Sequence, residues 1–353
     1  MNSTQRLPAR LTPLDVALGA LLRDLKPVTA RGLTGGASSA TLDVPELKSW
    51  PQCDIASADG WALRASDLVG ASSYTPLPLA KAPVWVEAGD RIPANCDCVL
   101  DEDSVDLSGP IAQVLAEAIP GQGVRRKGGP IADARRIADA WRPGDLSAHR
   151  PRVRLVNVPG GSITAKLIAN GLRTAGAGVT CVEATARDVA SIGKQLDGGD
   201  CDLLMIVGGS GVGRTDASVS ALAARGEVIA HGFALQPGRT AAIGRVGQTA
   251  VIVIPGAPDQ ALAVWWSIVL PVLDRLANRE RGTLSLPLAR KIASGVGLAE
   301  IVLLERRDDA WMPLAIGDLP LEIVARADAW LLVSGGSEGY AAGTPVSAYV
   351  LRE

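Results

Sequence analysis

The chain has 353 residues, of which 35 are Lys or Arg and 37 are Asp or Glu, so its formal net charge is −2. This length exceeds what one ordinary core supports and predicts two to four domains, and the lack of a concentrated basic run argues against a nucleic-acid partner. No apolar run approaches the ~18 residues that a membrane span needs, and Asp15, Arg23 and Asp24 interrupt the segment where a signal peptide needs an apolar core, so we expect a cytoplasmic protein without a membrane partner.

The first predicted element is an amphipathic helix over residues 13–26. Thr12, Pro13 and Asp15 form the pattern of an N-cap, a first-turn proline and a capping-box acid. Leucines then recur at helical spacing, at Leu14, Leu18, Leu21, Leu22 and Leu25. This apolar face needs cover, which another part of the chain or a second subunit can provide.

The segment SADGWALRASDL contains a polar turn at Asp59 and Gly60 that runs into an apolar strand. From the pattern alone, an ordinary Asp-Gly turn is favoured over a functional one. Residues 74–120 then alternate short β-rich pieces with Gly, Pro and Asp turns at about ten-residue spacing, which predicts a small all-β domain.

Two short motifs in this region have both a functional and an ordinary interpretation. Cys96 and Cys98 are predicted to be strand residues that face the same side; metal binding is the less favoured alternative because no second ligand pair is visible. Arg125, Arg126 and Lys127 lie beside glycines, where they could bind an anion or form a solvated basic turn. The five cysteines are odd in number and scattered, which fits reduced thiols better than a disulfide framework.

Residues 151–280 alternate strands with helices. RVRLVNV (152–158) predicts a strand that leads through a PGGS loop into a helix over 163–175, and a second strand (178–184) leads to a helix around 188–196. This rhythm predicts a parallel sheet with helices on both faces.

Two junctions in this region follow the same plan of buried strand, loop and helix start. LLMIV (203–207) is followed by a glycine loop, and AVIVI (250–254) by a Gly/Pro loop and a helix-like run over 259–277. The loop residues are Gly208, Gly209, Ser210, Gly211 and Gly213 after the first strand, and Pro255, Gly256 and Pro258 after the second. Side by side, both loops would lie at the carboxyl edge of the sheet, where open α/β folds bind ligands. Backbone N–H groups at a helix start favour a phosphate or another oxyanion; tight turns without a ligand are the alternative.

From residue 283 the pattern becomes β-rich again, which predicts a small separate β domain. The predicted fold is an α/β multidomain protein with a central parallel-sheet domain and small β-rich domains. We place an N-terminal helix and linker domain at 1–43 and 121–150, a small β-rich domain at 44–120, the α/β domain at 151–280 and the C-terminal β domain at 283–353.

Seven segments occur in the order, and at about the spacing, of one known family: LDVPE, SADGWAL, IPANCDCVLDED, PGQGVRRKG, GGSGVGRTD, LQPGR and IPGAP. Together they resemble the molybdopterin molybdenumtransferases, which insert molybdenum into the pterin dithiolene and are similar to the E domain of gephyrin. The resemblance covers nearly the whole chain. It implies an elongated homodimer of four-domain subunits, whose α/β domain binds adenylylated molybdopterin and molybdate and whose site is completed by the Asp-Gly turn of the other subunit.

The resemblance also assigns roles to single residues. Asp59 matches the family's aspartate in the Asp-Gly turn, and Asp188 and Asp216 match two acidic residues of the active site. Asp216 is the one implicated with the divalent metal, which we expect to be Mg²⁺. The phosphate-side loop matches at Pro237, Gly238 and Arg239, and the loop beside it matches at Pro255, Gly256 and Pro258.

The chain departs from the family pattern mainly at charged positions. Where the family has Thr-Gly-Asp-Glu, this chain has PGGS (159–162), and two family lysines are replaced, at Gly232 and Gln236. Further replacements are Ala257 for an asparagine, Ala88 for a threonine, and Gly129 and Pro130 for an acidic pair. Because removal of one preorganised electrostatic group costs ~10²- to 10³-fold in rate, these losses predict weakened turnover with the backbone loops intact.

Two functions from different classes follow. The first is a transferase that inserts molybdate into molybdopterin or its adenylylated form, with Mg²⁺ on Asp216 polarising the pyrophosphate. The second is a catalytically weak carrier that holds the pterin or the finished molybdenum cofactor; a purely structural paralogue is least favoured, because the glycine loops are kept. We predict the transferase, with a second copy of the chain, other molybdenum cofactor biosynthesis proteins or a target molybdoenzyme as partners.

Overall fold

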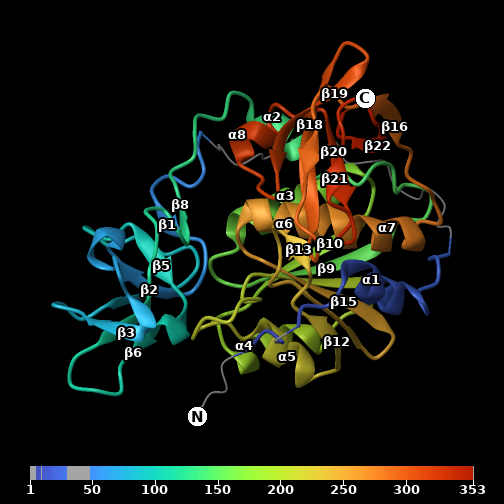
Figure 1. The fold of residues 1–353 in the computed structure, drawn as a ribbon. Helices are drawn as coiled ribbons and strands as arrows, with labels where there is room; N and C mark the ends of the chain where they lie inside the picture. The colour runs from blue at the N-terminus through green and yellow to red at the C-terminus, as the bar shows by residue number, and fades with distance from the viewer. Residues whose placement is uncertain (1–4, 9, 30–47, 353) are drawn as a thin grey trace. The chain divides into compact units, whose positions relative to one another are not determined.

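The structure is a computed structural model that describes residues 5–8, 10–29 and 48–352. These residues belong to two compact units (Figure 1): the main unit, Met1–Lys48 with Ile131–Glu353, and the small unit, Ser49–Pro130. The LDVPE segment (42–46) lies outside the described residues. The finer division into four domains stays a prediction.

The small unit consists of short, mostly antiparallel strands. Its strands are β1 (Ile55–Ala56), β2 (Gly60–Leu63), β3 (Ser72–Pro78), β4 (Val84–Val86), β5 (Cys98–Leu100), β6 (Val105–Asp106), β7 (Gln113–Ala116) and β8 (Val124–Arg125). β2 lies between β4 and β5, β7 lies between β3 and β6, and β1 pairs with β8. The predicted β-rich character of this region is confirmed.

The Cys-x-Cys pair in the small unit differs from its prediction. Cys98 begins β5, whereas Cys96 lies in the preceding turn, where its N–H donates to the Pro93 carbonyl (3.1 Å). Cys98 packs in the cluster around Trp61 and Cys96 packs in the cluster around Val99, so the two do not face the same side. Burial, together with the charge of the neighbouring aspartate, raises the pKa of Cys98 to about 11. The thiol therefore stays protonated at neutral pH.

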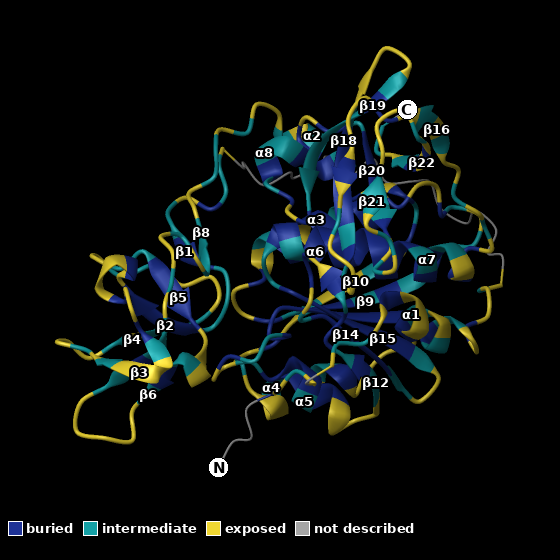
Figure 2. Cartoon of the chain, in the orientation of Figure 1, coloured by how far each residue is buried: buried dark blue, intermediate teal, exposed yellow. Residues whose placement is uncertain are grey.

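A six-stranded sheet forms the centre of the main unit. Its order is β10 (Gly178–Glu183), β9 (Arg152–Asn157), β11 (Leu203–Val207), β15 (Thr249–Ile254), β14 (Ala242–Val246) and β12 (Glu227–His231). The first four strands are parallel. Among them, β11 and β15 have the largest share of buried residues, and Figure 2 colours buried residues dark blue. β14 and β15 form an antiparallel hairpin, because only Gly247 and Gln248 separate them and Gly247 adopts a positive φ of 58°. The predicted parallel sheet therefore has an antiparallel edge.

Helices cover both faces of this sheet (Figure 1). α4 (Val189–Leu196) and α5 (Ser218–Ala223) pack on one face, where Ile192 and Leu222 join a cluster with sheet residues such as Val253. α3 (Ser162–Thr174) and α6 (Pro258–Val264) contact each other on the opposite face. The predicted arrangement of helices on both faces is confirmed.

The run predicted as one helix over 259–277 has three parts. α6 is followed by a π-helical turn (Trp265–Val269) and then by α7 (Leu270–Leu276). Pro271 has no N–H to donate to the preceding turn and its ring would clash there. The N–H of Leu270 instead donates to the Trp265 carbonyl, five residues back, which widens the helix.

The N-terminal helix is shorter than predicted and differently capped. α1 runs over Leu14–Leu22 with Pro13 at the N-cap and no side-chain cap. Thr12 does not cap it, because its backbone pairs with the segment around Phe233 instead. Leu14 and Leu21 are buried within the chain itself, which settles what covers the apolar face.

The C-terminal part of the main unit is mostly β-structure. Its strands are β16 (Leu284–Pro287), β17 (Ile292–Ala293), β18 (Ala299–Arg307), β19 (Ala310–Ile316), β20 (Ala329–Val333), β21 (Gly339–Tyr340) and β22 (Pro345–Val350), and short helices α2 (Ala134–Asp139) and α8 (Leu321–Val324) accompany them. A strand from the α/β region, β13 (Leu235–Gln236), pairs with β18 at the edge of this sheet. The chain is thus a mixed α/β multidomain protein. Among the described residues, no helix has the length and apolar run required to cross a membrane.

Candidate functional site

Four parallel strands of the central sheet end at the same level. In the pairing register, Asn157 of β9 lies opposite Glu183 of β10 and Val207 of β11, and Val207 lies opposite Ile254 of β15. The loops that follow these strands therefore leave the sheet at one edge, which is the usual ligand edge of an open α/β fold.

The loops approach one another closely at their glycines. A Cβ added at Gly256 would lie 3.5 Å from the Cα of Gly208 and 3.6 Å from the Cα of Gly161. The Thr164 hydroxyl at the start of α3 donates to the Gly256 carbonyl (2.6 Å). The prediction that the two junctions lie side by side is confirmed.

The loop at 208–217, which we call the glycine loop, needs its first two glycines. Gly208 and Gly209 have φ values of 94° and 67°, a region that favours glycine. A Cβ at Gly209 would lie 2.5 Å from the hydroxyl oxygen of Ser218, and that hydroxyl donates to the Gly208 carbonyl (2.7 Å). Ser210 is buried, so its side chain helps to hold the loop.

The LQPGR segment lies against the glycine loop and α6. The hydroxyls of Ser210 and Thr240 are 3.4 Å apart. A Cβ at Gly238 would lie 2.9 Å from Val264 and 3.1 Å from the Gln260 carbonyl, so only glycine permits this approach. Pro237, Pro255 and Pro258 are buried and Arg239 is exposed. The predicted phosphate-side loop and its neighbours are thus close together.

The start of α5 is occupied by the chain itself. The Gln5 side-chain oxygen accepts hydrogen bonds from the N–H groups of Val219 (2.7 Å) and Ser220 (3.0 Å). Its amide nitrogen donates to the carbonyls of Gly209 (3.1 Å) and Gly211 (2.7 Å). The sequence predicted that the N–H groups at this helix start would bind an oxyanion. They instead donate to the side chain of Gln5, which lies 214 residues before Val219 in the chain.

The position of one lost family lysine is also covered by the N-terminal segment. A Cβ at Gly232 would lie 2.9 Å from Leu7 and 3.2 Å from Pro8. A lysine side chain there would have to displace this segment. Gln236, the other lost lysine position, is exposed and has no such cover.

Asp216 forms an ion pair with Arg187, which sequence reasoning did not single out. The Arg187 Nη2 lies 2.8 Å from one carboxylate oxygen of Asp216, and the Gly213 N–H donates to the other (3.2 Å). Arg187 also donates through Nη1 to the Pro159 carbonyl (2.9 Å) and through Nε to the Thr215 hydroxyl (3.1 Å). Arg187 lies in the loop after β10, and these bonds link it to the loop after β9 and to the glycine loop.

Asp188 follows Arg187 and caps α4. Its carboxylate accepts a hydrogen bond from the Ser191 N–H (2.7 Å), which is the usual N-cap contact. This role explains the residue without a ligand, and its predicted catalytic role stays a prediction.

The residues around Asp216 do not form a metal cage. Within residues 5–8, 10–29 and 48–352, no three His, Cys, Asp or Glu side chains are grouped so that they could hold a metal ion. The PGGS turn contributes no carboxylate, and one oxygen of Asp216 already faces the Arg187 cation. A resident divalent metal therefore fits these residues poorly.

Asp59 lies in the small unit, at the start of β2. Its carboxylate accepts a hydrogen bond from the Ala88 N–H (2.8 Å). A Cβ at Gly60 would lie 2.2 Å from the Leu100 carbonyl oxygen, so glycine is required for the strands to pair. In the same unit, Arg126 pairs with Asp54 (3.3 Å), which favours the ordinary interpretation of the basic turn.

Asn157 is a second residue of this edge that sequence reasoning missed. Its amide nitrogen donates to Glu183 (3.3 Å), while its buried side-chain oxygen has no hydrogen-bond partner among the described residues. The available signal was an uncharged polar residue at the end of the predicted strand RVRLVNV, directly before the PGGS loop. Arg187 and Gln5 gave no comparable local signal.

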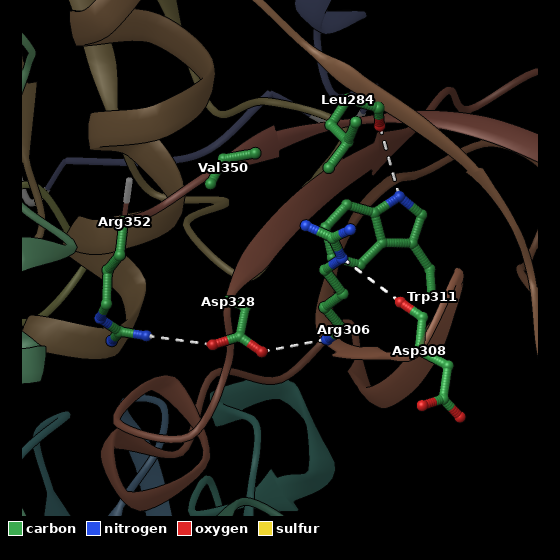
Figure 3. Close-up of a pocket in the computed structure, with 7 residues that line it drawn as sticks. All are labelled: Leu284, Arg306, Asp308, Trp311, Asp328, Val350 and Arg352. Carbon is green, nitrogen blue, oxygen red and sulfur yellow. Dashed lines mark hydrogen bonds and ion pairs between the residues drawn. The ribbon is translucent and has the colours of Figure 1, made fainter.

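A hollow of about 590 Å³ lies elsewhere, on the C-terminal strands (Figure 3). Its lining residues are Leu284, Arg306, Asp308, Trp311, Asp328, Val350 and Arg352. The charged groups in it contact one another: Arg352 lies 3.9 Å from Asp328, whose carboxylate accepts from the Arg306 N–H (3.0 Å). This network includes no predicted site residue.

Two family profiles match the chain. Residues 39–142 match the "MoeA N-terminal region (domain I and II)", and residues 162–275 match a "Probable molybdopterin binding domain". The second match spans the glycine loop, LQPGR and the loop after β15.

Characterised relatives and solved structures agree with these matches. The chain is 27% identical to molybdopterin molybdenumtransferase 2 of Mycobacterium tuberculosis over 72% of this chain and 76% of that protein. It is 26% identical to the molybdopterin molybdenumtransferase of Synechococcus elongatus over 84% and 87%. The molybdopterin biosynthesis MoeA protein of Pyrococcus horikoshii shares the fold, with a TM-score of 0.52, 20% identity and coverage of 98% and 100%. Because both profiles, the relatives and the fold agree across the chain, the protein belongs to the MoeA family of molybdopterin molybdenumtransferases.

Proposed function

We propose that this protein inserts molybdenum from molybdate into molybdopterin, in its adenylylated form, during molybdenum cofactor biosynthesis. The observation that carries the proposal is the meeting of three loops, at 208–217, 237–240 and 255–258, within the segment that matches the molybdopterin binding profile. Relatives that align over most of the chain are named as the transferase, so a carrier is not favoured.

In this proposal, the peptide groups of the glycine loop and of the loop after β15 line the substrate site beside the loop at 237–240. Arg239 is exposed at the end of LQPGR and binds an oxyanion of the substrate. Arginine suits this task because its planar fork holds phosphate through two N–H groups at once. Asp188 and Asp216 position the neighbouring loops through the bonds described above.

Two anions, molybdate and the substrate phosphate, must approach each other in this reaction. The site lacks lysines at Gly232 and Gln236, so fewer cations offset their repulsion. We therefore expect efficient pterin binding, and molybdenum insertion that needs a high molybdate concentration.

Three finer parts belong to the same proposal. The protein is cytoplasmic and acts as a homodimer in which Asp59 completes the site of the other subunit. The dimer rests on the family resemblance, because the apolar face of α1 is buried within one chain and does not require a partner. Light scattering at micromolar protein tests the dimer, and a monomer contradicts it.

Mg²⁺ arrives with the substrate phosphates, since this ion commonly binds through one or two carboxylates plus phosphate oxygens, and Asp216 is the carboxylate predicted for it.

The test of the function is complementation of a strain that lacks its own molybdenum-inserting enzyme. We expect rescue of molybdoenzyme activity at millimolar molybdate, weak rescue at trace molybdate, and better rescue at trace molybdate by Gln236→Lys. Gln248→Lys, which adds the same charge in an exposed turn of the main unit, is the control and leaves rescue unchanged. Pterin that co-purifies without rescue at any molybdate level would favour a carrier.

A further inference from the structure

Arg187 occupies the centre of the strand-end loops. It belongs to the loop after β10, yet its guanidinium bonds Pro159 in the loop after β9 and Asp216 in the glycine loop. A side chain held by three loops keeps one orientation, and a fixed guanidinium is well suited to bind an oxyanion.

The guanidinium retains capacity for a ligand. Its bonds to other described residues, at Pro159, Thr215 and Asp216, use three of the five N–H donors that a guanidinium has. The Arg187 side chain is 35% exposed, whereas the Asp216 side chain beneath it is 11% exposed. The cation therefore faces solvent, and the carboxylate holds it from the protein side.

The PGGS turn leaves room for this arrangement. Gly160 has a φ of 101°, and a Cβ added there would lie 3.1 Å from Nη1 of Arg187. Any side chain at this position would crowd the guanidinium.

The same geometry disfavours a resident divalent metal. Mg²⁺ demands near-octahedral oxygen ligands at 2.0–2.1 Å. One Asp216 oxygen lies 2.8 Å from Nη2 of Arg187 and the other accepts the Gly213 N–H, so an ion bound to this carboxylate would lie beside the Arg187 cation, which repels it.

We infer that Arg187 is a resident cation of this site and binds a phosphate-class oxyanion of the substrate directly, with Asp216 as the residue that positions it in place of the carboxylate for Mg²⁺ that the family resemblance implies. The inference rests on the proposed function, because it assumes that the strand-end loops receive the phosphate side of the substrate. It goes beyond that function because it adds Arg187 to Arg239 as a positive charge that the substrate meets and removes Mg²⁺ from Asp216.

The test measures AMP binding to the full-length protein by calorimetry, in EDTA and in Mg²⁺. We expect the wild-type affinity to be the same in both buffers, and Arg187→Gln to weaken it about tenfold or more, since a charge-assisted bond is lost. Arg187→Lys keeps the charge without the fork and falls between the two. Asp216→Asn keeps a side-chain oxygen that accepts from Nη2 of Arg187, so the cation stays in place. We expect this variant to bind AMP at least as tightly as wild type, because it removes a negative charge.

The matched control is Arg225→Gln. Arg225 pairs with Asp197 (2.6 Å) in the same unit, and its side chain is 37% exposed, close to that of Arg187. This variant should bind AMP like wild type. Circular dichroism on each variant checks that the fold is kept. If Arg187→Gln does not fold, the AMP affinity of Arg187→Lys is compared with that of the wild type instead.

The outcomes separate the inference from the function. Wild-type binding that vanishes in EDTA, or that is lost in Asp216→Asn and kept in Arg187→Gln, places a metal on Asp216 and overturns the inference while the transferase proposal stands. No AMP binding by the wild type at millimolar concentration contradicts both, because the loops then receive no phosphate.

Discussion

The glycine loop is held from two sides by side chains that come from distant parts of the chain. On one side, Gln5 is a neutral amide, 6% exposed, with four hydrogen bonds to backbone groups. On the other, Arg187 is a cation, 35% exposed, paired with Asp216. On the Gln5 side, the N–H groups at the start of α5 are bonded within the fold. On the Arg187 side, a positive charge faces solvent. The helix-start donors of a strand-loop-helix junction can therefore be bonded within the fold while a charged side chain beside them stays exposed.

The largest expected effect is on the Gln5 side. Gln5→Ala should lower the free energy of unfolding by about 2–4 kcal/mol, because four buried or part-buried backbone groups lose their partners. Urea denaturation measures this. Gln248→Ala, in an exposed turn of the same unit, is the control and should change stability by less than about 0.5 kcal/mol. Equal stability of Gln5→Ala and wild type would show that the N-terminal segment does not hold the glycine loop.

A moderate effect is expected next to Arg187. Asp188→Ala removes the cap of α4 and should cost about 1 kcal/mol in the free energy of unfolding. Asp188→Asn keeps an oxygen that accepts from the Ser191 N–H and should retain most of the stability. If both variants lose equally, the negative charge of Asp188 matters more than its cap.

A small stability effect is expected at Arg187 itself. Its ion pair is partly exposed, so Arg187→Gln should change the free energy of unfolding by about 0–1 kcal/mol while it weakens AMP binding. Thermal denaturation and calorimetry on the same sample measure both. A large loss of stability would make Arg187 a structural residue like Gln5 and would remove the contrast between the two sides.

The smallest effect is a pH dependence on the Gln5 side. His231 bonds the Ser210 carbonyl through Nε2 (2.9 Å), and burial lowers its pKa below the usual value near 6.5. The unfolded chain therefore binds the proton more readily, and stability should fall as the pH drops below about 6.5. His231→Gln should flatten this part of the curve of melting temperature against pH. A curve of unchanged shape would show that His231 does not contribute to it.

Local patterns predicted much of the α/β region. The apolar run LLMIV followed by two glycines indicated a buried strand and a turn, because a strand covered on both faces tolerates few polar residues and positive φ favours glycine. The helix predicted at 163–175 differs from α3 by one residue at each end, and the helix predicted around 188–196 corresponds to α4. Where the prediction failed, as at Pro271 and at Thr12, a missing N–H or a distant strand partner decided the local structure.

The sequence alone therefore determined the strands and the glycine turns, since each depends on residues within a few positions of one another, and the order of these short motifs along the chain determined the family. Only the tertiary structure decided which groups satisfy the loops. Gln5 and Gly209 are separated by 204 residues, and Arg187 and Asp216 by 29. No sequence periodicity indicates such pairs, because they form only when the strands assemble into the sheet and their ends come together. The distinction between a neutral, buried side and a charged, exposed side of one loop arises only at that stage.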